Sequence, residues 1–453
     1  MAFIIKSPIS GEPICIYQPI TQNKLKTVIS KANKAFLIWA NFTVKERCNF
    51  IKKLGLSVKK NKEDLAKIIT EETGKPIKQS FAEIEKCILF CEYVFKNADK
   101  ILSPEKIETD ANARIEFEPL GIIAEIMPWN FPFWQVFRAT LPTLVSGNTV
   151  ILRHSTFCLK CACAIETLFR EVFPKNVFNS VIGGHDIVEA IIKDKNIKGV
   201  SFTGSVETGK KIYSLAAENL KKCVLELGGS DPFIVLKDAD VLAAAEAGVR
   251  SRFANAGQSC TSAKRFIVER KIADQFVKHF TKLTAELKIG NPFDIDTDIG
   301  PLVNEEQIEK LDFQVKKSLE MGAKILLGGK RLPISGYYYT PTILTNIKPK
   351  MPVWKEETFG PVAPIMIVEN EKEAIKMANN SKYGLGASLW TRNLKKANNL
   401  EKKIEAGFVA INGNVRSDPN LPFGGVKESG IGRELDKFGF FEFVNIKSIK
   451  IYK

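Results

Sequence analysis

The chain has 453 residues, 45% of them hydrophobic and 26% charged, which is typical of a folded protein of about two to three domains and excludes a disordered or fibrous one. The formal net charge is +15, but the lysines are spread among acidic neighbours, which disfavours nucleic-acid binding. Residues 1–10 contain no secretory leader pattern, and no apolar run reaches the ~20 residues that span a bilayer. We therefore expect a cytoplasmic protein that has neither nucleic-acid nor membrane partners.

Helical periodicity dominates the first hundred or so residues, and short β-branched runs then alternate with helices. The predicted helices cover residues 24–39, 44–60, 62–70, 71–94, 158–173, 187–192 and 204–217. The predicted strands cover residues 121–127, 149–152, 177–182, 199–202, 222–227, 233–236, 265–269, 324–327, 364–368 and 408–412. This alternation predicts an α/β fold of two lobes, divided near Gly228 and Gly229. We also expect an extended segment at 442–452 to pair with the extended residues 113–118 or with a partner subunit.

The nine cysteines are an odd number without framework spacing, which indicates reduced thiols. Cys158, Cys161 and Cys163 lie close together, but their run has helical apolar periodicity and no second ligand pair follows at zinc spacing. We interpret them as core residues and expect no metal site. Only three scattered histidines are present, which disfavours a Ser–His or Cys–His hydrolase.

Five residues in special turns are candidates for chemistry, and each has a simpler structural interpretation. Cys260 follows a Gly-Gln turn, where it is either an exposed nucleophile or a packed thiol. Asn130, in a Pro-rich turn, either donates to an oxyanion or satisfies its own turn. Glu226 ends a strand before Gly-Gly and is either a general base of raised pKa or a surface carboxylate. Glu357 and Phe359 flank a Gly-Pro turn and are candidates for ribose and nicotinamide contacts.

The run 200–209 predicts a strand, a turn and the start of a helix, an arrangement that attracts phosphate through backbone N–H groups. Gly204 and Ser205 lie in this turn. The segment nearly matches a P-loop, but Lys211 stands where that motif needs a Ser or Thr for Mg²⁺. A G-x-G-x-x-G dinucleotide fingerprint is also missing from the first predicted βα unit.

Taken together and in this order, these segments resemble the aldehyde dehydrogenase superfamily over nearly the whole chain. The motifs are PWNFP at 128–132, FTGSVETG at 202–209, ELGG at 226–229, GQSC at 257–260, EETFGPV at 356–362 and PFGGVKESGIGRE at 422–434. The resemblance implies two Rossmann-like α/β domains with a small bridging β element for oligomerisation, bound NAD+ or NADP+, and a homodimer or homotetramer. The implied division is 1–101 and 119–228 for the cofactor domain, 229–440 for the catalytic domain, and 102–118 and 441–453 for the bridging element.

The resemblance also implies roles for individual residues. Cys260 attacks a small aldehyde, and Asn130 with the backbone N–H of Cys260 stabilises the oxyanion. Hydride then leaves the thiohemiacetal for the nicotinamide, and Glu226 activates the water that hydrolyses the thioester. CoA-acylating relatives lack that base, so release of a free acid is favoured. Glu434 is implied to assist a proton relay. The implied cofactor contacts are Trp129, Arg153, Thr156, Gly204, Ser205, Glu357 and Phe359.

Within the superfamily the chain is most similar to bacterial succinate-semialdehyde dehydrogenases that use NAD+ or NADP+. By this resemblance Arg138 and Ser417 bind the carboxylate of the substrate. One departure is Ala254, where better-known members of that group carry a second arginine. Arg252 and Arg416 are the candidates to compensate for it.

Cofactor preference and substrate stay open. Arg153-His154 replaces the Lys-Pro of many members at the ribose strand, and Thr156 stands where strict NAD+ enzymes often place Glu, so no carboxylate there repels a 2′-phosphate. The leading prediction is oxidation of succinic semialdehyde to succinate. The alternatives are another short aldehyde, such as glutarate semialdehyde or an aliphatic one, and a non-catalytic protein on the same scaffold.

Overall fold

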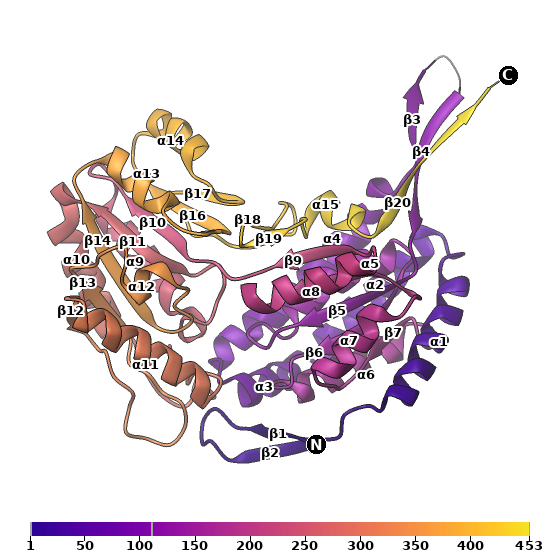
Figure 1. Ribbon diagram of the computed structural model, residues 1–453, viewed down its shortest axis with the longest axis horizontal. Helices are drawn as coiled ribbons and strands as arrows, with labels where there is room; N and C mark the ends of the chain where they lie inside the picture. Colours follow the sequence, from indigo (N-terminus) through magenta and orange to yellow (C-terminus); the bar gives the residue numbers. More distant parts are fainter. Residues whose placement is uncertain (1, 110–111, 453) are drawn as a thin grey trace.

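The computed structural model describes residues 2–109 and 112–452. Figure 1 shows two α/β lobes beside each other and a narrow arm that leaves the first lobe and carries the C-terminal strand. Within the described ranges, no helix combines the length and apolar character needed to cross a membrane.

The first lobe is built on a six-stranded sheet in the order β19-β9-β8-β5-β6-β7. Its strands are β5 (Ile122–Met127), β6 (Thr149–His154), β7 (Phe178–Ser180), β8 (Ile197–Thr203), β9 (Lys222–Glu226) and β19 (Gly430–Ile431). Neighbouring strands from β9 to β7 pair in parallel, whereas β19 pairs antiparallel with β9. A parallel sheet is buried on both faces, which explains why β5 is apolar almost throughout and fully buried.

Helices cover both faces of this sheet. They are α1 (Gln22–Trp39), α2 (Val44–Lys60), α3 (Lys62–Thr73), α4 (Ile77–Ile101), α5 (Trp134–Val145), α6 (Leu159–Val172), α7 (His185–Lys193), α8 (Val206–Glu218) and α15 (Asp436–Phe441). Alternate residues of β5 serve the two sides: Ile122, Ala124 and Ile126 pack with α1, α7 and α8, while Met127 joins the core formed with α2 to α6. This two-sided packing is the doubly wound arrangement expected of a Rossmann-like lobe.

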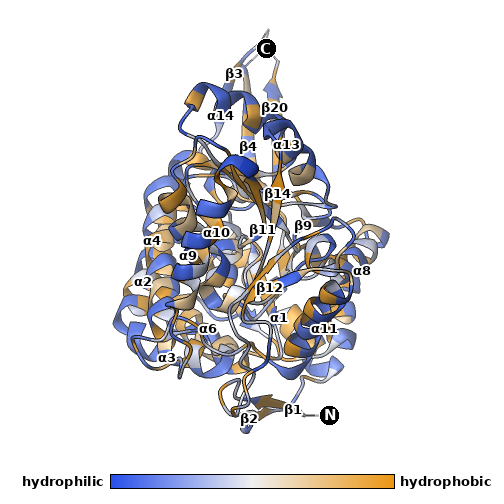
Figure 2. Ribbon diagram, turned by 90° about the vertical axis from the view of Figure 1, so that its left-hand side faces the viewer, coloured by the Kyte–Doolittle hydropathy of each residue, from blue (hydrophilic) through white to orange (hydrophobic). Residues whose placement is uncertain are grey.

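The second lobe is built on a seven-stranded sheet in the order β12-β13-β14-β11-β10-β16-β17. Its strands are β10 (Asp231–Val235), β11 (Ala263–Glu269), β12 (Lys324–Leu327), β13 (Thr342–Thr345), β14 (Val362–Val368), β16 (Gly386–Trp390) and β17 (Phe408–Ile411). Its helices are α9 (Val241–Phe253), α10 (Arg270–Ala285), α11 (Glu305–Glu320), α12 (Pro352–Lys355), α13 (Glu371–Asn379) and α14 (Leu394–Leu400), with 3-10 turns η1 (Ala254–Gly257) and η2 (Glu401–Lys403). Figure 2 shows hydrophobic residues along β11 and β14 and mixed faces on the surrounding helices.

The arm is a three-stranded antiparallel sheet in the order β20-β4-β3. Its strands are β3 (Glu105–Glu108), β4 (Asn112–Pro119) and β20 (Val444–Ile451), and β20 pairs with β4 along its whole length. The predicted pairing of the C-terminal strand with the segment near residue 113 is therefore confirmed within the chain. Two small ladders complete the fold, β1 (Phe3–Lys6) with β2 (Pro13–Tyr17), and β15 (Tyr383–Gly384) with β18 (Val426–Lys427).

Every strand predicted from the alternation is present, β12 and α2 have the predicted bounds, and the other predicted strands have shifted ends. The patterns gave no indication of β13 or β16, short strands that are buried on both faces, or of the β1–β2 hairpin. The predicted domain division stays a prediction. Within it, β19 and α15 lie in the range assigned to the catalytic domain but pack on the first lobe, through β9 and α5.

Candidate active site

The candidate residues of the first lobe gather at one edge of its sheet. PWNFP follows β5, Arg153 lies near the end of β6, Gly204 follows β8, and Glu226 is the last residue of β9. Because these strands are parallel, their carboxyl ends share one edge. In the second lobe, the loops that carry Cys260 and Glu357 run into the amino ends of β11 and β14. The site therefore lies where the carboxyl edge of one sheet meets the amino edge of the other.

The approach to Cys260 has an unusual backbone. Asn255, Ala256 and Gly257 have φ values of 51°, 51° and 75°, so three successive residues lie in the left-handed region. A Cβ at Gly257 would lie 2.3 Å from the carbonyl oxygen of Gly360, so glycine is required there by space as well as by φ. Non-glycine residues held in this region store strain of about 1–3 kcal/mol each, which is common at functional loops.

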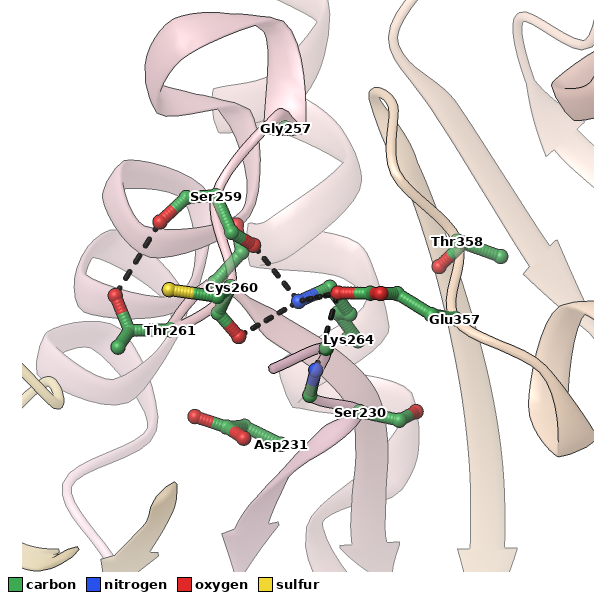
Figure 3. Close-up of polar contacts among 12 residues, drawn as sticks. Ser230, Asp231, Gly257, Ser259, Cys260, Thr261, Lys264, Glu357 and Thr358 are labelled. Carbon is green, nitrogen blue, oxygen red and sulfur yellow. Dashed lines mark hydrogen bonds and ion pairs between the residues drawn. The ribbon is translucent and has the colours of Figure 1, made fainter. Parts of the chain in front are cut away.

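Lys264 holds the loop that carries Cys260. Its fully buried ammonium donates to the carbonyl oxygens of Ser259 and Cys260, each at 2.7 Å, and forms an ion pair with Glu357 at 3.1 Å. The same oxygen of Glu357 also accepts from the backbone N–H of Gly229 at 3.1 Å. Figure 3 shows the Sγ of Cys260 on the side of the loop away from this lysine. The main chain of the nucleophile loop is thus held while its thiol stays free of hydrogen bonds among the described residues.

Asn130 lies against the same loop. Its Nδ2 donates to the carbonyl oxygen of Gln258 at 3.0 Å, and its Oδ1 accepts from Gln135 at 3.1 Å. The Nδ2 of Asn255 donates to the carbonyl oxygen of Asn130 at 2.9 Å. An amide nitrogen carries two hydrogens, so Asn130 is oriented by one and keeps a second for an oxyanion.

The PWNFP turn is held from behind by two buried side chains. Glu83 of α4 accepts from the backbone N–H groups of Phe133 and Trp134 at 2.9 and 3.0 Å and caps α5. The Nε2 of His154 lies 2.9 Å from the carbonyl oxygen of Pro132, while its Nδ1 accepts from the backbone of Ser155. Burial lowers the pKa of His154 to about 4, so the ring is neutral and donates through Nε2.

Glu226, Arg138 and Glu434 form a buried charged cluster. Arg138 Nε lies 2.5 Å from Glu434, and its Nη2 lies 3.9 Å from Glu226. All three side chains are at most 5% exposed, and both oxygens of Glu226 lack hydrogen bonds among the described residues. Gly424 lies directly over Glu226, and a Cβ there would lie 3.1 Å from Oε1. The C-terminal motif at 422–434 therefore closes the site over the carboxylate.

Burial raises the pKa of Glu226 to about 8, against the lowering effect of Arg138 and with a further rise from Glu434. A carboxylic acid that titrates near neutral pH is well matched to general base catalysis. Burial also raises the pKa of the Cys260 thiol to about 12, although Arg138 and Lys264 act to lower it. The thiol must therefore lose its proton as it reacts.

The predicted cofactor residues of the first lobe lie along the carboxyl edge of its sheet. Ser205 caps α8, accepting from Thr208 N–H at 3.2 Å, and no described residue accepts from the N–H groups of Val206 and Glu207. The free N–H groups at this helix start suit a phosphate.

The predicted cofactor residues Arg153 and Thr156 lie at the end of β6. Arg153 donates to the carbonyl oxygen of Gly183 at 3.0 Å, and Thr156 follows two residues after the end of the strand. Two further predicted cofactor residues, Trp129 and Phe359, meet edge to face at 5.8 Å between ring centres. Free N–H groups, a cation and aromatic rings thus fit an anionic dinucleotide with an aromatic head.

The predicted substrate residues come from α5 and from the segment that follows β17. The guanidinium of Arg138 lies 5.0 Å from the ring centre of Phe423, and Ser417 accepts from Trp134 Nε1 at 3.1 Å. Arg252 is completely buried and donates to main-chain carbonyl oxygens, among them that of Gly360 at 2.6 Å, so it holds the loop before Cys260. Arg416 is exposed. The geometry therefore speaks against Arg252 as the replacement for the arginine missing at Ala254.

Comparisons with known proteins agree with this geometry. The family model described as "Aldehyde dehydrogenase family" matches residues 2–449. A probable succinate-semialdehyde dehydrogenase [NADP(+)] of Synechocystis sp. is 40% identical over 100% of both chains. Succinate semialdehyde dehydrogenase [NAD(P)+] Sad of Escherichia coli is 40% identical, covering 98% of this chain and 96% of the relative. The crystal structure of succinic semialdehyde dehydrogenase from Streptococcus pyogenes in complex with NADP+ superimposes with a TM-score of 0.97 at 35% identity over 100% of both chains.

The chain belongs to the aldehyde dehydrogenase family. The predicted family and the predicted α/β fold with two Rossmann-like lobes are thereby confirmed. The roles of individual residues remain predictions.

Sequence reasoning missed two residues that hold the loops of the site, Glu83 and Lys264. Lys264 and Glu83 act by holding loops, and such positioning contacts join segments far apart in the chain. Only the four-residue spacing between Cys260 and Lys264 was a local signal, and it is too common to be informative.

Proposed function

We propose that this protein oxidises succinic semialdehyde to succinate, using NAD+ or NADP+, through a covalent thioester on Cys260. The observation that carries the proposal is the meeting of Cys260, Asn130 and Glu226 from three distant segments around one buried point, with the charge of Arg138 beside them. The names of the relatives support the substrate and the cofactor. The Rossmann-like domain division predicted from the sequence, a homodimer or homotetramer, and a cytoplasmic location belong to the same proposal.

The residues of this chain divide the work. Cys260 Sγ adds to the aldehyde carbon, and the free amide hydrogen of Asn130 with the backbone N–H of Cys260 stabilises the oxyanion. When bound, the nicotinamide supplies the hydride acceptor. Glu226, with its raised pKa, takes the proton of the water that hydrolyses the thioester. Glu434 forms an ion pair with Arg138 in the same buried cluster, where it accepts that proton or returns it.

The test compares succinic semialdehyde with butanal, which has the same carbon chain but no carboxylate, by following reduced cofactor with each of NAD+ and NADP+. We expect kcat/KM to favour the semialdehyde by at least ~10-fold, about 1.4 kcal/mol of transition-state discrimination. Equal values would leave a general aldehyde dehydrogenase and remove the semialdehyde assignment.

A second candidate is oxidation of an uncharged short aldehyde. It is favoured by Ala254, and by the ion pair between Arg138 and Glu434, which partly neutralises the predicted carboxylate-binding arginine. The same assay decides between the two.

A further inference from the structure

A lysine that no motif indicated lies on the substrate side of the site. Lys86, on α4, places its Nζ 2.5 Å from the Oγ of Ser417 and 4.1 Å from the ring centre of Trp134. Trp134 Nε1 donates to the same oxygen at 3.1 Å. Two donors thus converge on Ser417, so its hydroxyl oxygen acts as an acceptor and its own hydrogen is left to donate elsewhere. No described residue accepts that hydrogen.

The charge of Lys86 is not balanced by its neighbours. Among the described residues it has no carboxylate within ion-pair distance. The nearby Glu83 is instead paired with Lys75 and caps α5. Asp418, the other acidic neighbour, is turned to Asn420. A ring face and a hydroxyl stabilise an ammonium only partly, so the position retains affinity for an anion.

Lys86 also lies at a suitable place relative to the nucleophile. Trp134 and Phe423 belong to the same apolar cluster that packs against Cys260. The charge of Arg138 affects the pKa of both Lys86 and Cys260, so the arginine stands near each of them. A cation beside the apolar cluster that packs against the thiol suits an aldehyde with a carboxylate at its far end.

We propose that Lys86, together with the hydroxyl of Ser417, binds the carboxylate of the aldehyde substrate and supplies the positive charge that is missing at Ala254. This inference rests on the proposed function and names a specificity residue within it. Arg138 shares its charge with Glu434, Arg252 is occupied by main-chain oxygens, and Lys86 carries the unbalanced charge beside this cluster. Burial and Arg138 lower the pKa of Lys86 to about 8, opposed by Cys87, Glu83 and Asp418, and a bound carboxylate would raise it again.

The experiment uses the full-length protein with saturating cofactor and compares three variants. Lys86→Met removes the charge and keeps the chain length, Lys86→Arg keeps the charge, and Lys96→Met is the matched control on an exposed position of the same helix. We expect Lys86→Met to raise KM for succinic semialdehyde by ~10-fold or more, while kcat and the constants for butanal stay within ~2-fold. Lys86→Arg should restore most of the affinity, and Lys96→Met should behave as the wild type.

Product inhibition gives an independent readout, because succinate carries the same carboxylate. Inhibition by succinate, competitive with the aldehyde, should weaken in Lys86→Met by a similar factor and not in Lys96→Met. Parallel loss of activity toward succinic semialdehyde and butanal would overturn the inference, since it would indicate a structural role. Unchanged KM and unchanged inhibition in Lys86→Met, with the wild-type preference intact, would overturn it while leaving the proposed function in place. A wild type without preference would remove both.

Discussion

Two charged clusters lie on either side of Cys260, and they are built in opposite ways. In the first, the buried Lys264 pairs with one oxygen of Glu357, which also accepts from the backbone N–H of Gly229, and donates to two main-chain carbonyl oxygens. In the second, Arg138 faces two carboxylates, Glu226 and Glu434, whose oxygens are left without hydrogen bonds among the described residues. An ion pair such as that of Lys264 and Glu357 fixes the geometry of the loops it joins. A cluster with unequal charges, such as Arg138 with its two carboxylates, holds a group whose protonation changes near neutral pH, which proton transfer needs.

The largest effect on activity is expected from a substitution in the cluster of Arg138, Glu226 and Glu434. Glu226→Gln keeps the shape of the side chain but cannot accept a proton, so we expect kcat to fall by ~10²–10⁴-fold without a loss of overall stability. Steady-state turnover and the thermal midpoint, measured on the same preparation, check both halves of the expectation. A burst of reduced cofactor equal to the number of sites should remain, because acylation of Cys260 precedes hydrolysis. A variant with full turnover would show that another base acts.

For the pair of Lys264 and Glu357, the main expected effect is on folding stability. Lys264→Met leaves Glu357 unpaired and frees the carbonyl oxygens of Ser259 and Cys260, so we expect a loss of folding stability of ~3–5 kcal/mol. Denaturant unfolding measures it.

The matched control removes an exposed ion pair. Lys288→Met breaks the contact with Asp296, where the side chains are 67% and 80% exposed, and should cost ~1 kcal/mol or less. Equal losses of folding stability in Lys264→Met and Lys288→Met would contradict the larger contribution expected from the pair of Lys264 and Glu357.

The smallest effect is a pH dependence of stability. The folded protein raises the pKa of Glu226 to about 8, above its ordinary value of 4.5, so between these values the folded state binds more protons than the unfolded one. Stability from this group is therefore complete at low pH and is lost as the pH rises through about 8. Glu226→Gln should gain stability relative to the wild type as the pH rises from ~6 to ~8, and the gain should level off above that, as thermal midpoints would show.

A second carboxylate provides the control for this measurement. Glu428 interacts with Lys210 and Lys382, which hold its pKa below the ordinary value, so its titration is finished well below neutral pH. Glu428→Gln should differ from the wild type by a constant amount over the same range. A constant difference for Glu226→Gln as well would mean that its titration does not occur there.

Local signals were sufficient for the elements and for the order of the chemical groups. The period of the apolar residues in 44–60 predicted α2 with its observed bounds, because an amphipathic helix needs only its own sequence and one buried face. Cys260, Asn130 and Glu226 were recognised because each lies in a turn of unusual composition. By contrast, β16 was missed although it lies within the second sheet, because its small residues Gly386, Ala387 and Ser388 lack the β-branched run that indicates a buried strand.

What the sequence determined by itself is the family, the alternation of strands and helices, and the residues that can do chemistry, since these depend on local composition and spacing. What only the tertiary structure decided is how the charges are shared. Arg138 forms an ion pair with Glu434, and Arg252 donates to main-chain oxygens. Lys86 lies beside Ser417 without a carboxylate at ion-pair distance among the described residues. The physical reason is that the field at a buried group is the sum over neighbours from distant segments. Those neighbours meet when the carboxyl edge of one sheet closes on the amino edge of the other.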